Sequence, residues 1–190
     1  MADSQNVLDT GLNIDAQFAT NSAENPLTDP LEQSLENTLD NELWQYAYQV
    51  YSQTGVEAAL LALQDDHGAD INLILQALWL ASEGKQWTEA CIPADYDQWI
   101  AEQVLPLRKM RRRMKVDWPE QEGFRQRVKN LELKAEQYGL EMLFEGGLQE
   151  VVMKDDEIKS EAGFVNSNLI QLAQYLNIPH NYFESLISLI

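Results

Sequence analysis

The sequence predicts an all-α fold, a compact multi-helix bundle preceded by a disordered acidic N-terminal tail. The stretch from Leu43 to Gly84 holds the densest run of apolar residues, which recur at the three- and four-residue spacing of buried helix faces. Residues 1–84 contain no Lys or Arg. The first 39 residues are rich in Asn, Ser, Thr, Asp and Gln, so they bury too little apolar surface to offset the entropy of ordering. We therefore expect a tail at 1–39 and a helical domain at 40–190.

Composition narrows the class of protein. A chain of 190 residues with 45% hydrophobic content suits one domain of ordinary size plus a tail. No stretch approaches the roughly 20 continuous apolar residues of a membrane span. The start, MADSQNVLDT, lacks the basic and apolar regions of a secretory signal. Cys91 is the only cysteine, so neither an internal disulfide nor a cysteine-based metal cage is expected. We expect a cytoplasmic protein with no cofactor and no membrane contact.

Local signals predict the ends of the first three helices. Asp40 suits the start of the first helix, because its carboxylate accepts hydrogen bonds from exposed amides. Thr54 and Glu57 form a capping box for the second helix, and Gly68 ends it because glycine adopts the left-handed conformation easily. Asp70 suits the cap of the third helix. That helix is apolar on nearly all sides, which predicts a central position.

Two longer helices are predicted next. The fourth begins near Asp95, and Pro106 within it predicts a kink or a restart, because proline has no amide hydrogen. The fifth follows Pro119, and Gly146-Gly147 is expected to end it. An apolar seam in this helix, expected to pack on the core rather than to dimerise, consists of Phe124, Val128, Leu131, Ala135, Tyr138 and Met142.

Two short helices, at about 164–176 and 180–190, are expected to close the chain. Their junction is loosely similar to a helix-turn-helix, whose second helix enters the major groove of DNA. The second helix here contains Glu184 and no Arg or Lys, so it offers no phosphate contacts. We interpret the pair as a packing motif.

The fourth helix carries the main candidate binding site. Ten of the 13 basic residues fall between Arg108 and Lys134. Met110 and Met114 are predicted to face inward, leaving Arg108, Arg111, Arg112 and Lys115 around the outside. The proposed contact residues are Arg108, Lys109, Arg111, Arg112, Arg113 and Lys115.

Two explanations of this basic helix stay open. It binds either the protein's own acidic surface or its tail, or else an external partner, which is an acidic protein or a polyanion such as RNA or a phosphorylated metabolite. The net charge of −18 repels nucleic acid on average, and no glycine-rich phosphate loop accompanies the helix. The pattern therefore favours self-pairing or a protein partner over nucleic acid.

A weaker candidate is the acidic cluster of Asp65, Asp66 and Asp70. Aspartates at helix ends can hold magnesium and a diphosphate, which makes a magnesium-dependent enzyme a third alternative. A simpler interpretation is that Asp70 is a cap and the other two are solvated, so we assign no metal site. His67 and His180 lie far apart and in no recognised motif. The sequence favours a non-enzymatic role.

Several separated segments share a pattern with a known family. They are Trp44, residues 55–58 (GVEA), 63–65 (LQD), 68–73 (GADINL), 79–80 (WL), Trp99 and 106–108 (PLR). Together they resemble a proteobacterial family of uncharacterised all-helical proteins, a domain of unknown function, over roughly residues 40–140. The resemblance implies a compact helical domain and no assigned chemistry. The resulting hypothesis is an interaction or accessory protein that uses residues 108–115 as its contact surface.

Overall fold

The computed structural model describes residues 39–149 and 160–190, and every regular element within them is helical. The predicted all-α class is confirmed. The predicted tail lies outside the described residues except for Leu39. The α-helices are α3 (Glu42–Tyr51), α4 (Val56–His67), α5 (Ile71–Ser82), α6 (Tyr96–Trp99), α7 (Leu105–Asp117), α8 (Glu122–Gln149), α9 (Glu161–Tyr175) and α10 (Glu184–Ile187). A π-helical segment, η2 (Ile100–Val104), and three short 3-10 turns, η1 (Glu89–Cys91), η3 (Pro119–Gln121) and η4 (His180–Phe183), complete the fold. No helix in the described part of the chain is long and apolar enough to cross a membrane.

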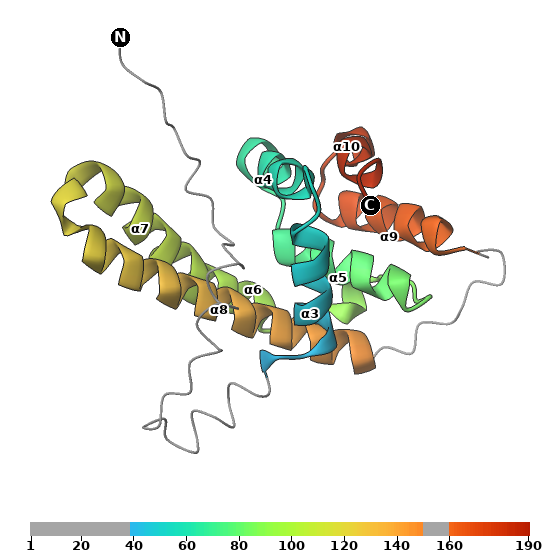
Figure 1. The fold of residues 1–190 in the computed structure, drawn as a ribbon. Helices are drawn as coiled ribbons and strands as arrows, with labels where there is room; N and C mark the ends of the chain where they lie inside the picture. Colours follow the sequence, from blue (N-terminus) through green and yellow to red (C-terminus); the bar gives the residue numbers. More distant parts are fainter. Residues whose placement is uncertain (1–38, 150–159) are drawn as a thin grey trace, which may run out of the picture.

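Helix α5 forms the centre of the domain, as predicted. Every residue from Ile71 to Ala81 is buried, and the helix contacts α3, α4, α8 and α9 (Figure 1). Gln76 satisfies its buried amide fully: Nε2 donates to the carbonyls of Cys91 and Leu143, and Oε1 accepts from Trp87 Nε1. The apolar sequence of this helix therefore fixes the core, and one polar side chain ties it to two neighbouring segments.

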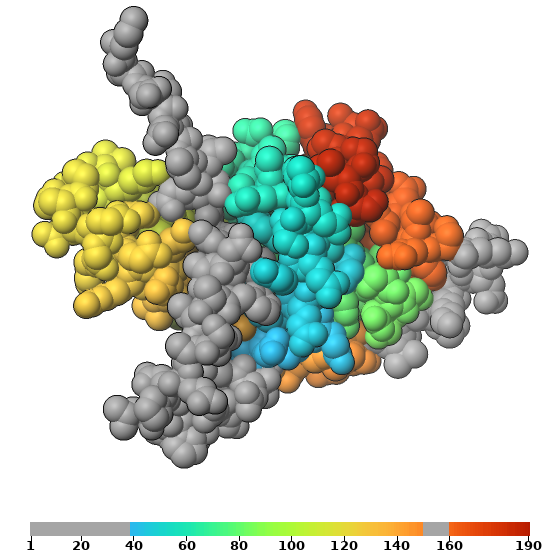
Figure 2. All heavy atoms as spheres, in the orientation of Figure 1, coloured from blue at the N-terminus to red at the C-terminus, as the bar shows by residue number. Residues whose placement is uncertain are grey.

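Helices α7 and α8 form an antiparallel hairpin that projects from the body (Figure 1). In the space-filling view its outer end stands clear of α3, α4 and the C-terminal helices (Figure 2). Pro119 begins the 3-10 turn η3 that joins the two helices, and Pro106 lies at the start of α7, where the helix changes from π to α geometry. The position of Pro106 agrees with the predicted restart, because the first turn of a helix needs no proline amide.

Several predicted helix ends differ in the structure. Asn41, not Asp40, caps α3, since its Oδ1 accepts from the Trp44 amide at 2.9 Å. The predicted capping box at Thr54 is wrong: α4 follows Gly55, whose φ of 89° turns the chain into the helix without a side-chain cap. Leu39 is buried and its carbonyl accepts from Gln137 Nε2. Leu39 is therefore packed against the helical domain.

Other predicted ends are confirmed. Gly68 terminates α4 with a φ of 71°, and Asp70 caps α5 by accepting from the Asn72 amide at 2.9 Å. At the C-terminal junction, Phe183 and Leu186 are fully buried, which confirms the packing interpretation of this helix pair.

The glycine pair in α8 has a different role from the one predicted. The helix runs through both residues to Gln149. A Cβ at Gly146 would lie 2.3 Å from the carbonyl oxygen of Cys91, and one at Gly147 would lie 2.9 Å from the Trp79 ring. These glycines do not end the helix. They let the η1 turn and α5 approach its backbone.

The predicted apolar seam of α8 is half right. Val128 and Ala135 are buried against the rest of the protein. Phe124 and Leu131 are 55% and 58% exposed, and both lie in the first half of α8, which belongs to the projecting hairpin. The periodicity identified an apolar face, but only part of that face meets the core.

Candidate functional site

The inward face of α7 differs from the prediction. Met114 is buried as expected, but Met110 is 48% exposed and Arg111 is completely buried. The predicted place of Arg111 on the outer surface is therefore wrong. The reason lies on the facing helix, since α8 presents carboxylates rather than apolar side chains at this level of the hairpin.

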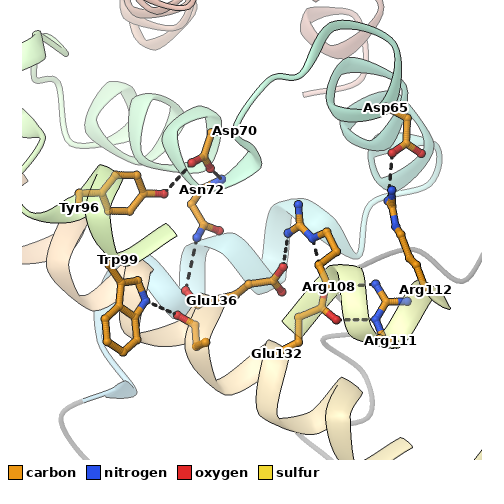
Figure 3. Close-up of polar contacts among 11 residues, drawn as sticks. Asp65, Asp70, Asn72, Tyr96, Trp99, Arg108, Arg111, Arg112, Glu132 and Glu136 are labelled. Carbon is orange, nitrogen blue, oxygen red and sulfur yellow. Dashed lines mark hydrogen bonds and ion pairs between the residues drawn. The ribbon is translucent and has the colours of Figure 1, made fainter. Parts of the chain in front are cut away.

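These carboxylates form a buried ion network with α7 (Figure 3). Arg111 Nε donates to Glu132 Oε2 at 2.5 Å, and Arg108 Nε donates to Glu132 Oε1 at 3.2 Å. Arg108 also donates through Nη2 to Glu136 Oε1. Burial raises the pKa of Glu136 to about 7, with Arg108 opposing the rise and Glu132 adding to it. Two of the six proposed contact residues thus serve the protein's own structure.

The other four proposed contact residues, Lys109, Arg112, Arg113 and Lys115, are exposed. Arg113 pairs with Asp117 at 3.4 Å, and Arg112 pairs with Asp65 at 3.2 Å. Exposed ion pairs of this kind contribute only about 0–1 kcal/mol, so both guanidinium groups remain available to a ligand or partner. Within residues 39–149 and 160–190, no carboxylate pairs with Lys109 or Lys115.

The aspartate cluster divides into separate roles. Asp65 pairs with Arg112, Asp66 is exposed, and Asp70 caps α5 while its Oδ2 accepts from the Tyr96 hydroxyl at 2.9 Å. Burial raises the pKa of Asp70, and its hydrogen bonds to Tyr96 and backbone amides oppose that rise. Within residues 39–149 and 160–190, no three or more His, Cys, Asp or Glu side chains are grouped so that they could hold a metal ion. The three aspartates therefore do not form the magnesium-binding arrangement on which the third alternative rests.

The structure brings the two predicted sites together. A cavity of about 370 Å³ lies between the α4–α5 junction, η2, α7 and α8. Its lining includes Asp65 and Asp70 from the acidic cluster and Arg108 and Arg112 from the basic helix. Sequence reasoning missed Glu132, Glu136, Asn72 and Tyr96. One usable signal was present. Glu132 and Glu136 are four residues apart and so lie on one face of a helix, as do Arg108 and Arg111, which are three residues apart.

Apolar side chains are also exposed along the hairpin. Seven of the ten exposed large hydrophobic residues in the described chain lie on α7, α8 and the turn between them: Leu105, Met110, Val116, Trp118, Phe124, Leu131 and Leu148. Val116 is the most exposed, at 78%. We refer to Lys109, Met110, Arg113, Lys115, Val116, Trp118, Phe124 and Leu131 as the hairpin surface. It combines positive charge with apolar area, and neither methionine spacing nor charge counting predicted that combination.

These features define a class of protein: an all-α domain with a projecting basic hairpin and a small polar cavity at its base. The chain belongs to the family described as "Protein of unknown function (DUF2390)", whose sequence pattern matches residues 42–143. This match confirms the predicted family resemblance. No curated protein and no solved structure matches the chain.

Proposed function

We propose that this protein is a non-enzymatic interaction or accessory protein whose hairpin surface docks an acidic, apolar-containing segment of a partner protein. The observation that carries the proposal is the exposure of Val116, Trp118 and Phe124 at the outer end of a basic helical hairpin. Exposed apolar residues grouped on one projecting element are typical of protein interaction sites.

Charge supports the acidic nature of the partner. The whole chain carries a net charge of −18, yet ten of its 13 basic residues lie on this hairpin. A positive surface on an otherwise acidic protein attracts a negatively charged segment. Lys109 and Lys115 are exposed and have no carboxylate partner in the described structure, so they are suited to this attraction.

The apolar component favours a protein over a polyanion. Protein interfaces combine aromatic and apolar centres with a polar, charged rim. Polyanion binding depends chiefly on the number of phosphates neutralised, and Arg108 and Arg111 are already engaged by Glu132 and Glu136. RNA or a phosphorylated metabolite on the same helix remains the second candidate function.

We propose a cytoplasmic setting, which the single, buried Cys91 supports because free thiols persist in reducing compartments.

A site-specific photo-crosslinker tests the proposal in living cells. It is placed at Val116 on the hairpin surface and, as a control, at exposed Gln53 in the turn between α3 and α4. We expect a nuclease-resistant protein adduct at position 116 and none at position 53. Mass spectrometry of the adduct should identify a crosslinked peptide rich in Asp and Glu with interspersed apolar residues.

A second arm uses the combined Lys109→Glu, Arg113→Glu and Lys115→Glu variant, which spares buried Arg111. The adduct should disappear, because the charges at the docking surface are reversed. A nucleic-acid adduct would establish the polyanion alternative instead. A crosslink to residues 1–38 of the same chain, or no adduct at position 116, would contradict an external protein partner.

A further inference from the structure

The cavity at the base of the hairpin is separate from the hairpin surface and is built differently. Its inner wall is formed by Asn72 of α5 and Glu136 of α8, which are 4% and 1% exposed. Arg108 and Arg112 of α7 and Asp65 near the end of α4 also line it. Apolar side chains from η2 and α7, including Ile100, Val104 and Leu105, complete the wall.

Two hydrogen-bond acceptors of this inner wall have no partner among the described residues. They are Glu136 Oε2 and Asn72 Oδ1. The other atoms of these groups are satisfied: Glu136 Oε1 accepts from Arg108, and Asn72 Nδ2 donates to the Glu136 carbonyl at 3.4 Å. A buried polar atom without a partner costs about 1–3 kcal/mol, so native proteins rarely retain two in one place without a use for them.

The chemistry of these atoms selects the ligand. Both are acceptors, so they require N–H or O–H donors. Three carboxylates and two guanidinium groups line the cavity, and Arg108 is already engaged by two carboxylates. A cationic donor is therefore favoured over an anion. A volume of about 370 Å³ suits a small metabolite.

We propose that this cavity binds a small primary ammonium compound, with the ammonium group donating to Glu136 Oε2 and Asn72 Oδ1. The Asp65–Arg112 pair, about half exposed at the rim, meets the rest of the ligand. Asp65 suits the second ammonium group of a diamine, whereas Arg112 suits the carboxylate of a free amino acid. This site does not depend on the proposed docking function.

Protonation provides a built-in signature of such binding. An ammonium ligand requires the ionised form of Glu136, whose pKa is raised to about 7 by burial, with Arg108 opposing and Glu132 adding to the rise. The charged and titratable groups around it are Arg108 and Arg111 of α7, Glu132 of α8 and Tyr51 of α3, with Asp70 also lining the cavity. Affinity should therefore rise about tenfold between pH 6 and pH 8, while aliphatic amines stay protonated throughout.

Amide NMR of the full chain tests the proposal with putrescine and L-leucine as probes. Uncharged 1,4-butanediol, which matches the length of putrescine, is the control. We expect at least one amine to shift the amide signals of residues 64–72 and 136, with the predicted rise in affinity from pH 6 to pH 8 and no response to the diol. Putrescine binding indicates a diamine ligand, and L-leucine binding indicates an amino acid.

Variants make the assignment residue-specific. Glu136→Gln should weaken amine binding at least about tenfold, because it removes the charge that receives the ammonium group. Glu141→Gln, on the same helix but outside the cavity, should leave binding unchanged. The wild-type shift map and pH profile stand by themselves if Glu136→Gln does not fold. The proposal is overturned if neither amine binds below about 10 mM, a dissociation constant equivalent to only about 2.7 kcal/mol, if the shifts lie elsewhere, or if the diol binds equally well.

Discussion

Arg111 and Glu132 lie fully inside the hairpin, and the guanidinium Nε donates to the carboxylate Oε2 at 2.5 Å. Each charge belongs to a different helix, so separating α7 from α8 would leave both without their partner. A buried pair of this kind contributes little to net stability compared with apolar packing, but loss of one member is costly. We therefore expect the pair to favour a single register of the two helices.

Replacement of Arg111 by Ala should lower the free energy of unfolding by about 3–5 kcal/mol, because Glu132 is then left buried with only its contact to Arg108. Urea denaturation of the full chain measures the change. Arg113→Ala, on the exposed side of the same helix, should change stability by no more than about 0.5 kcal/mol. Equal effects of the two substitutions would show that the buried pair has no special role.

Glu136 should make stability depend on pH. Its folded pKa of about 7 lies above the ordinary value of 4.5, so the folded state retains the proton more strongly than the unfolded state. This contribution is fully present below about pH 4.5 and is lost as pH rises through about 7. Urea midpoints from pH 4 to pH 8 measure it, as the difference between wild type and Glu136→Gln. The stability of wild type minus that of Glu136→Gln should fall as pH rises from about 4.5 through 7. A rise in this signed difference would contradict the assignment.

Tyr96→Phe should destabilise the protein by about 1–3 kcal/mol, because Asp70 loses the hydroxyl that donates to its Oδ2. Thermal unfolding at neutral pH gives the change. Tyr182 is 43% exposed, so Tyr182→Phe is a matched control with an expected effect within about 0.5 kcal/mol. If both tyrosine variants have the same melting temperature as wild type, the Asp70–Tyr96 hydrogen bond does not contribute to the stability of the fold.

Two glycines of α8 should respond to alanine in opposite directions. Gly146→Ala places a methyl group 2.3 Å from the Cys91 carbonyl oxygen, and overpacking of this kind costs about 1–3 kcal/mol. Gly123→Ala meets nothing within 4 Å and should stabilise the helix by up to about 1 kcal/mol. Urea denaturation curves of the two variants measure the change in the free energy of unfolding. A neutral Gly146→Ala would show that η1 does not pack closely on α8.

Periodicity predicted most of the fold. The residues from Ile71 to Ala81 are apolar on nearly all sides of the helix, and this identified the central helix. Gly68 and Asp70 correctly marked the end of α4 and the start of α5. Those signals are local, because a left-handed glycine or a capping carboxylate acts within a few residues. Asp40 and Thr54 were equally good local signals and were not used, since Asn41 caps α3 and α4 begins after Gly55 with no side-chain cap.

The candidate site was predicted in pieces. The basic helix and the acidic cluster were each visible in the sequence, and both reach the same cavity. Their meeting depends on how α7 packs against α8 and the α4–α5 junction, which no local pattern encodes. The burial of Arg111 has the same origin: a charged residue is predicted to face solvent unless a partner such as Glu132 is known to face it.

The helical class, the central position of α5 and the concentration of positive charge between Arg108 and Lys134 could all be predicted from the sequence. These properties follow from spacing and composition along one chain segment. The packing of the helices sets which arginines are buried, which apolar residues of α8 remain exposed, and that Asn72 and Glu136 line one cavity. Those outcomes depend on contacts between residues far apart in the sequence, such as the Asn72 side chain and the Glu136 carbonyl, which are 64 positions apart.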